Sequence, residues 1–180
     1  MKLVILDRDG VINKDSVHSI KSPEEWVPIE GSLEAISLLN KNGYTVVVAT
    51  NQSAIGKKLI NIVTLDNIHK KMQDLVNKKR GKIDKIFYCP HVEEDDCACR
   101  KPKTGLMQKI KEHYSINLEK IPAIGDSTRD LEAYSKSEAQ PILVRTGNGK
   151  DVEKKKSFPS NTLIFDNLLE ASKFLSLIHI

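Results

Sequence analysis

The chain has 180 residues, of which 39% are hydrophobic, 29% charged and 5% aromatic. This composition is typical of a folded globular protein and argues against a fibrous, disordered or membrane-embedded chain. The length predicts one compact domain over residues 1–180, large enough to bury a core without disulfide bonds. The net charge of +4 suits an anionic substrate, but the basic residues are too few and too scattered to predict binding to nucleic acid.

Two features of the sequence predict its compartment. No apolar run approaches the ~18–20 residues of a membrane-spanning helix, and the apolar run Leu3–Leu6 is too short for the core of a signal peptide. We therefore expect a cytoplasmic monomer with a small-molecule substrate and with no membrane or nucleic-acid partner. The three cysteines lie within eleven residues, at 89–99, which favours a metal or redox site over a disulfide framework.

Short apolar runs alternate along the chain with segments that carry apolar residues at helical spacing. In chain order, the expected elements are a strand at 3–6, a helical turn at 22–25, a helix at 32–41, a strand at 44–49, a helix at 65–76, a strand at 83–88, a helix at 106–114, a strand at 121–124, a helix from Ser127, a strand at 141–144, a polar segment at 145–160, a strand at 163–165 and a final helix from Asn167. This alternation predicts an α/β fold, a Rossmann-like parallel sheet with helices on both faces. Ligands bind at the carboxyl ends of strands in such sheets, so we expect polar clusters that follow different strands to converge there.

Acidic residues follow two of the predicted strands. Asp7 and Asp9 come directly after the first strand, and Asp126 follows the strand at 121–124, with Asp130 one helical turn later. A single pair of acids after a strand is as consistent with a solvated turn as with a site, but carboxylates at neighbouring strand ends repel one another. Their natural partner is a hard divalent cation such as Mg²⁺, which takes oxygen ligands and retains waters that a phosphate can replace.

The second predicted strand also ends in polar residues. Thr50, Asn51, Gln52 and Ser53 offer hydroxyl, amide and backbone donors that suit a phosphate. Lys101 by itself would be interpreted as a surface lysine. Together with these acidic and polar residues, it supplies a cation on the other side of such a phosphate.

Together these residues resemble the haloacid dehalogenase superfamily of phosphatases. The four superfamily motifs correspond, in the right order, to Asp7-Arg8-Asp9-Gly10, Thr50-Asn51-Gln52, Lys101, and Gly125-Asp126 with Asp130. The resemblance implies that Asp7 is the nucleophile that forms an aspartyl-phosphate, and that Asp9 is first the general acid and then the general base. It also implies that Thr50 and Lys101 hold the phosphoryl group.

The same resemblance implies a Mg²⁺ ion held by the Asp7 side chain, the Asp9 backbone carbonyl and Asp126. Asp130 is either a further ligand or a residue that orients the ligands. An acid at Asp9 favours a phosphatase over a dehalogenase, because a dehalogenase has no leaving alcohol to protonate.

A second cluster consists of Cys89, His91, Cys97 and Cys99, spaced as CxH and CxC with five residues between the two halves. Three thiolates and one imidazole make a closed tetrahedral Zn²⁺ site, which has no open position for a substrate and is therefore structural. The alternative is a set of buried free thiols beside an exposed histidine. The zinc would hold the loop that delivers residues 100–101.

The other histidines are not expected to take part in the chemistry. His69, His113 and His179 are interpreted as exposed residues of helices or of the terminus. His18 either lines the pocket or is an ordinary loop residue.

The zinc loop and the motifs DRDG, TNQS and CRKP narrow the resemblance to the branch that contains histidinol-phosphatases and heptose-bisphosphatases. The sequence is more similar to the heptose-bisphosphatase family, which removes the 7-phosphate of D-glycero-D-manno-heptose 1,7-bisphosphate in cytoplasmic nucleotide-heptose synthesis for lipopolysaccharide or related glycans. Histidinol-phosphatases usually have an acidic residue at the position of Ser53, whereas Arg100 and Arg145 better suit a second phosphate. The resemblance therefore implies substrate contacts from Asn51, Gln52, Ser53, Arg100 and Arg145.

One segment departs from the family. The heptose-bisphosphatase motif NQSGIARG is NQSAIGKK here, at Asn51–Lys58, so that a glycine and the arginine are lost. No cap-domain insertion is visible at 10–31 or 53–83, which predicts a capless enzyme with an open site. The alternative from another class is a non-catalytic sugar-phosphate-binding module, which the intact pair Asp7 and Asp9 disfavours.

Overall fold

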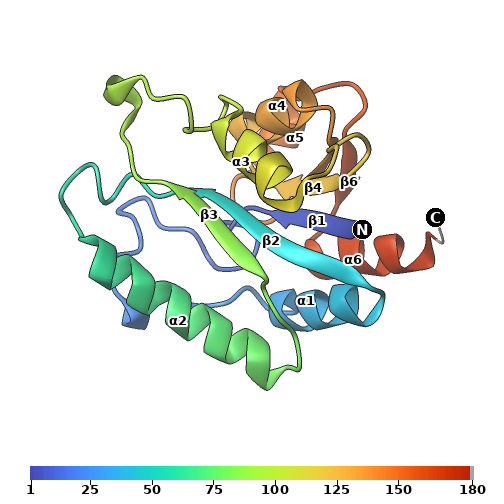
Figure 1. The fold of residues 1–180 in the computed structure, drawn as a ribbon, viewed down its shortest axis with the longest axis horizontal. Helices are drawn as coiled ribbons and strands as arrows, with labels where there is room; N and C mark the ends of the chain where they lie inside the picture. The colour runs from blue at the N-terminus through green and yellow to red at the C-terminus, as the bar shows by residue number, and fades with distance from the viewer. Residues whose placement is uncertain (179–180) are drawn as a thin grey trace.

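The computed structural model describes residues 1–178. Within them, six parallel strands form one sheet in the order β3-β2-β1-β4-β5-β6 (Figure 1). Their bounds are β1 Lys2–Leu6, β2 Tyr44–Asn51, β3 Lys85–Cys89, β4 Pro122–Gly125, β5 Gln140–Val144 and β6 Leu163–Phe165. Leu6 of the central strand β1 pairs with Val48 of β2 and with Ile124 of β4, so the carboxyl ends of these three strands open onto the same edge of the sheet.

Helices cover both faces of this sheet. The connecting elements are η1 Pro23–Glu25, α1 Ser32–Lys41, α2 Ile62–Lys78, η2 Glu93–Asp95, α3 Gly105–Tyr114, α4 Thr128–Lys136, α5 Gly149–Lys155 and α6 Leu168–Leu177. One face packs against α1, α2 and α6, and the other against α3, α4 and α5 (Figure 1). The predicted α/β fold with helices on both faces is confirmed.

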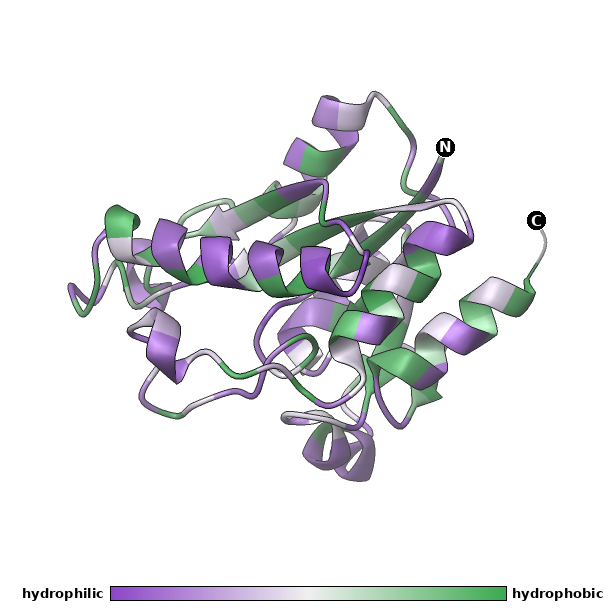
Figure 2. Ribbon diagram, turned by 90° about the horizontal axis from the view of Figure 1, so that it is seen from below, coloured by the Kyte–Doolittle hydropathy of each residue, from purple (hydrophilic) through white to green (hydrophobic). Residues whose placement is uncertain are grey.

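The apolar run of β1 divides between two cores. Leu3 and Ile5 lie in the core shared with α3 and α4, whereas Val4 and Leu6 lie in the core shared with α1 and α2. Since both faces of this strand are buried, its sequence is an unbroken apolar run instead of an alternating pattern. In Figure 2 the central strands are largely green, whereas α2 mixes purple and green along its length, as expected of a helix with one buried face.

Several elements differ in their bounds from the sequence-based expectation, β2 and α2 being longer, and one helix was not expected. The third strand spans Lys85–Cys89 instead of 83–88, and Ile83 is buried just before it. The segment expected to be polar contains the helix α5. The sequence did not predict this helix because only Gly149 and Val152 are buried in it, which leaves no apolar stripe to recognise.

The long connection between β1 and α1 is packed against the body of the protein. Trp26 in this connection is fully buried. The ammonium of Lys71 on α2 donates hydrogen bonds to the carbonyls of Pro23 and Trp26 at 2.6 and 2.8 Å, which ties the connection to that helix. No helix among the described residues is long and apolar enough to cross a lipid bilayer.

Candidate active site

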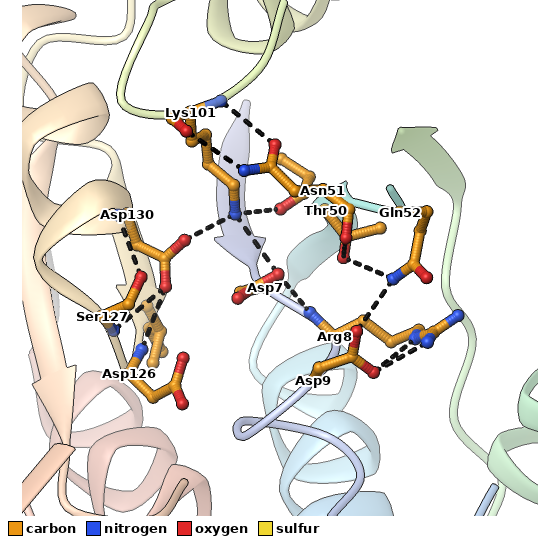
Figure 3. A network of polar contacts seen from close by, with 12 residues as sticks. Asp7, Arg8, Asp9, Thr50, Asn51, Gln52, Lys101, Asp126, Ser127 and Asp130 are labelled. Carbon is orange, nitrogen blue, oxygen red and sulfur yellow. Dashed lines mark hydrogen bonds and ion pairs between the residues drawn. The ribbon is translucent and has the colours of Figure 1, made fainter. Parts of the chain in front are cut away.

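The carboxyl ends of β1 and β4 bring three acidic side chains together (Figure 3). Asp7 directly follows β1, Asp126 directly follows β4, and Asp130 lies in the first turn of α4. One oxygen of each carboxylate lies within 4.8 Å of the other two. The Lys101 ammonium lies 2.7 Å from Asp130 Oδ1 and 3.2 Å from Asp7 Oδ1. The structure thus brings together four of the residues that the sequence placed in the site.

The protein does not balance the charge of this cluster by itself. The four side chains belong to residues that are at most 8% exposed, and one ammonium faces three carboxylates. Burial and the nearby Asp130 raise the pKa of Asp7 to about 7. Burial, Asp130 and Asp7 raise the pKa of Asp126 to about 8. A divalent cation would offset this excess negative charge, and the oxygen donors present are those that Mg²⁺ prefers.

Asp130 holds other members of the cluster in place. Its Oδ2 accepts hydrogen bonds from the backbone N–H groups of Asp126 and Ser127, both at 3.2 Å, while its own N–H donates to Ser127 Oγ in the capping box that begins α4. Burial tends to raise the pKa of Asp130, but the charge of Lys101 and the hydrogen bonds to Asp130 together outweigh burial, and the pKa is lowered. Because protein donors engage both of its oxygens, the geometry favours an orienting role for Asp130 over a role as metal ligand.

Asp126 is packed against two glycines. The backbone N–H and the Nδ2 group of Asn148 donate to Asp126 Oδ2 at 2.9 and 3.3 Å. A Cβ atom added at either Gly10 or Gly147 would lie 2.1 Å from the same oxygen, and both glycines have positive φ, 82° and 56°. Thr146 Oγ1 donates to the Gly10 carbonyl at 2.6 Å and joins the two loops. The sequence analysis assigned no role to Asn148, whose partner lies on another loop.

A separate set of donors binds the carboxylate of Asp9 (Figure 3). Arg8 Nη2 and Nε donate to Asp9 Oδ1 at 2.7 and 3.0 Å, and Asn13 Nδ2 donates to the same oxygen at 2.9 Å. Gln52 Nε2 donates to Oδ2 at 2.9 Å. Burial would raise the pKa of Asp9, but the Arg8 guanidinium and these hydrogen bonds together lower it. Arg8 is fully buried, and the sequence analysis had missed it because an arginine in a loop is usually exposed.

Residues at the end of β2 position Lys101 and Asp9. Asn51 pairs with the Lys101 backbone, its Nδ2 donating to the carbonyl and its Oδ1 accepting from the N–H, both at 3.1 Å. The Lys101 ammonium also donates to the Ala49 carbonyl at 2.7 Å. Gln52 Nε2 donates to the buried Thr50 Oγ1 at 3.0 Å. The amides of Asn51 and Gln52, expected to bind substrate, are thus engaged by the neighbouring site residues.

A cavity of about 250 Å³ opens beside the acidic cluster. Ser53 lies in its wall, as do three basic residues besides Lys101, namely Lys57, Arg100 and Arg129. Lys57 occupies the position of the arginine in the NQSGIARG motif, so a cation remains at this place. His18 is exposed and is not among the residues that line the cavity.

The predicted metal ligands converge at the carboxyl end of β3, with donor atoms within 4.8 Å of one another: Cys89, His91, Cys97 and Cys99. The Sγ–Sγ distances are 2.9, 3.5 and 3.6 Å, and His91 Nδ1 lies 3.5 and 3.4 Å from Cys89 and Cys99 Sγ. A tetrahedral zinc ion with Zn–S bonds of about 2.3 Å needs sulfur atoms about 3.8 Å apart, which these donors reach with small shifts.

The thiols of this cluster differ in acidity. Burial and the contact with the Cys99 thiol raise the pKa of Cys89 to about 12. At Cys97 burial acts in the same direction, but hydrogen bonds from the Arg100 N–H and from neighbouring groups outweigh it and lower the pKa to about 6. None of the three cysteines, all of which the structure describes, forms a disulfide bond.

Two sequence-based predictions are wrong. Arg145 does not reach the cavity, because its guanidinium is bound to Glu153 and Asp166 with contacts of 2.9 and 2.7 Å. His69 is buried on the inner face of α2, not exposed. The signal in the sequence for its burial is the spacing of four residues from Leu65, which places His69 on the apolar face of the helix. His113 is exposed as predicted, and His179 lies outside the described residues.

Comparison with known proteins agrees with this geometry. The family described as "Polynucleotide kinase 3 phosphatase" matches residues 2–160. A D-glycero-beta-D-manno-heptose-1,7-bisphosphate 7-phosphatase from Pseudomonas putida is 50% identical over 175 residues, which are 97% of this chain and 99% of that protein. The chain belongs to the heptose-bisphosphate phosphatase family.

Solved structures of this family share the fold. The crystal structure of D,D-heptose 1,7-bisphosphate phosphatase from B. bronchiseptica, complexed with magnesium and phosphate, is 44% identical, has a TM-score of 0.96, and covers 97% of this chain and 98% of its own. The corresponding protein from Burkholderia thailandensis is 41% identical with a TM-score of 0.79, and the match covers 98% of this chain and 99% of that one. The resemblance to haloacid dehalogenase-like phosphatases is confirmed.

The close packing of Gly10 and Gly147 against the Asp126 carboxylate leads to a testable prediction. Gly10→Ala should lower the affinity for Mg²⁺ by about tenfold or more, because the new Cβ has to displace the Asp126 carboxylate. Gly43→Ala is the matched control, since Gly43 has a φ of 84° and its nearest neighbour atom would be 3.8 Å from a new Cβ. Magnesium titration by calorimetry and urea unfolding of both variants separate the two effects. If both variants lose stability equally and keep the same affinity for Mg²⁺, the packing of Gly10 does not position Asp126 for the ion.

Proposed function

We propose that this protein is a Mg²⁺-dependent phosphatase that removes the 7-phosphate of D-glycero-D-manno-heptose 1,7-bisphosphate. The observation that carries the proposal is the buried cluster of three carboxylates and one lysine at the sheet edge. It occurs in a chain that is 50% identical, over nearly its whole length, to a relative with this name. Because the names of several relatives specify the beta form, we propose the β anomer as the substrate.

We assign the role of nucleophile to Asp7. Its carboxylate oxygen attacks phosphorus and forms the bond of an aspartyl-phosphate, while the bond between phosphorus and the sugar oxygen breaks. Water then attacks the same phosphorus, which releases inorganic phosphate and restores Asp7. Lys101, whose ammonium lies 3.2 Å from Asp7 Oδ1, and Thr50 hold the phosphoryl oxygens and offset their charge during both transfers.

We assign the roles of general acid and general base to Asp9. It gives a proton to the leaving sugar oxygen, and the resulting carboxylate accepts a proton from the attacking water. The four hydrogen bonds that Asp9 accepts favour its charged form. The negative charge of a phosphate bound beside it acts in the opposite direction and favours proton uptake before the first transfer.

We propose that Asp7, the Asp9 backbone carbonyl and Asp126 hold Mg²⁺, with Asp130 orienting the site. When bound, the ion supplies positive charge that neutralises and positions the phosphate. The magnesium and phosphate in the B. bronchiseptica relative support this assignment.

We also propose that Cys89, His91, Cys97 and Cys99 hold a structural Zn²⁺ ion. Four protein ligands leave no position for substrate, so the ion would fix the loop that carries residues 100–101. Free thiols suit a reducing compartment, which supports a cytoplasmic location. We propose further that the protein is a capless monomer that serves nucleotide-heptose synthesis, without a membrane or nucleic-acid partner.

The second phosphate of the substrate is proposed to bind at the rim of the cavity. With the reacting phosphate beside Asp7, the sugar extends toward the cations Lys57, Arg100 and Arg129. Arg100 is half-buried and carries a planar fork of donors that suits a phosphate. Ser53 supplies no negative charge that would attract the ammonium of histidinol phosphate.

The nucleophile assignment predicts the effect of two substitutions. Asp7→Asn should abolish phosphate release while leaving the fold intact, because an amide cannot form the aspartyl-phosphate. Asp9→Asn should lose about 10²–10⁴-fold in turnover, the usual contribution of a general acid. Steady-state phosphate release and circular dichroism measure both effects, with Asp74→Asn on the exposed side of α2 as control. Near-normal turnover by Asp7→Asn would contradict the mechanism.

The zinc assignment predicts one tightly held Zn²⁺ ion per chain, distinct from exchangeable Mg²⁺. Cys97→Ser should release the zinc and lower the melting temperature, because the binding energy of a structural zinc contributes to folding. Elemental analysis after dialysis, combined with thermal unfolding, checks this. Protein purified under reducing, chelator-free conditions that contains no zinc would refute the site.

The substrate assignment predicts that Arg100 contributes to the preference for the heptose bisphosphate over a small monophosphate. Arg100→Ala should lower kcat/KM for the heptose bisphosphate by about tenfold to hundredfold, equivalent to ~1.5–3 kcal/mol for a charged hydrogen bond. The same variant should act almost normally on a small monophosphate. Phosphate release from both anomers of the bisphosphate, from the small monophosphate and from histidinol phosphate tests this. If histidinol phosphate is the best substrate of the unmodified protein, that activity replaces the heptose assignment.

A further inference from the structure

We propose that His69 is a positioning residue for the phosphatase reaction and that it acts through Arg8 on the carboxylate of Asp9. This inference rests on the proposed role of Asp9 as general acid and adds a residue on a different element of the fold. His69 does not reach the cavity, and no motif considered above includes it.

The contact that carries the inference links α2 to the loop after β1. His69 is 7% exposed, and its Nε2 lies 3.1 Å from Nη1 of Arg8, which is itself fully buried. The other edge of the same guanidinium, Nη2 and Nε, is bound to Asp9 Oδ1 at 2.7 and 3.0 Å. His69, Arg8 and Asp9 therefore form a continuous buried chain of hydrogen bonds that ends at the proposed acid (Figure 3 shows its Arg8–Asp9 end).

The chemistry of the groups determines the direction of these bonds. A guanidinium group has donors only, so Arg8 needs an acceptor at Nη1 as well as at Nη2 and Nε. A neutral imidazole accepts at Nε2 when its proton is on Nδ1. Burial and the charge of Arg8 lower the pKa of His69 to about 3, which keeps the ring neutral at ordinary working pH.

A planar guanidinium bound at both ends cannot rotate in its plane. His69 therefore determines the direction from which Arg8 holds Asp9 Oδ1. Asn13 and Gln52 bind the same carboxylate, but neither bears a charge. The hydrogen bonds from Arg8 are therefore the strongest that Asp9 accepts.

The position of His69 on its helix argues against a role in packing alone. The other buried residues of α2 are Leu65, Ile68, Met72 and Val76, all of which are apolar. A leucine at position 69 would fit this pattern and would need no hydrogen-bond partner. The imidazole instead places its acceptor against Nη1, the guanidinium nitrogen that Asp9 does not bind.

A comparison of two leaving groups tests the inference. The heptose bisphosphate releases an alkoxide that needs a proton, whereas p-nitrophenyl phosphate releases a weakly basic phenolate that hardly needs one. The value of kcat/KM covers the steps through the departure of the leaving group, so it reports the acid role of Asp9 separately from its later role as base. His69→Leu removes the acceptor, and His69→Gln keeps an acceptor oxygen near the position of Nε2.

We expect His69→Leu to lower kcat/KM for the heptose bisphosphate by about tenfold to hundredfold, the cost of misplacing a reacting group by about 1 Å. The same variant should lower kcat/KM for p-nitrophenyl phosphate far less, and His69→Gln should restore most of the loss. An equal loss on both substrates, or a His69→Gln variant as impaired as His69→Leu, would overturn the inference.

Two controls separate the possible causes of failure. Met72→Ala weakens the packing of the same helix without removing an acceptor, and it should lower stability without discriminating between the two substrates. Asp9→Asn should discriminate between them more strongly than any variant of His69. If Asp9→Asn does not discriminate, the proposed acid role of Asp9 fails and the inference fails with it. If Asp9→Asn discriminates but His69→Leu does not, only the inference about His69 fails.

Discussion

The buried ammonium of Lys101 is the constraint on which the rest of the site depends. It lies between Asp7 and Asp130, 3.2 and 2.7 Å from their oxygens, in a place where water hardly reaches. One such charge makes it possible to bury a group of three carboxylates, and it leaves a negative excess that favours a divalent cation. The raised pKa values of Asp7 and Asp126 have the same cause, because burial and mutual repulsion act on both.

Lys101 reaches this place because a residue far away in the chain holds its backbone. Asn51, at the end of β2, binds both the N–H and the carbonyl of Lys101. The four-residue Cys/His cluster ends two residues before Lys101, at Cys99. A metal ion in that cluster would therefore act on catalysis through the position of one lysine, without contact with the substrate.

The carboxylate of Asp9 has electrostatic surroundings that differ from those of Asp7. Its carboxylate is held outside the three-carboxylate cluster by Arg8 and Asn13, which lie in the loop after β1, and by Gln52, which directly follows β2. Two neighbouring acids on one short loop thus have opposite environments: burial and repulsion raise the pKa of Asp7, while a guanidinium and amide donors lower that of Asp9. Such a separation of two carboxylates suits the division of labour between nucleophile and acid.

The sequence by itself determined the α/β fold, the ends of most strands and the residues Asp7, Asp126, Lys101 and Cys89 that converge beside them. These features follow from local patterns, because apolar runs form strands and parallel strands end at one edge of the sheet. Only the tertiary structure decided which partner each charged group has. Arg145 pairs with Glu153 and Asp166, and His69 lies inward against Arg8. Local patterns do not predict such pairings, because they depend on helix rotation and on contacts between residues far apart in the chain.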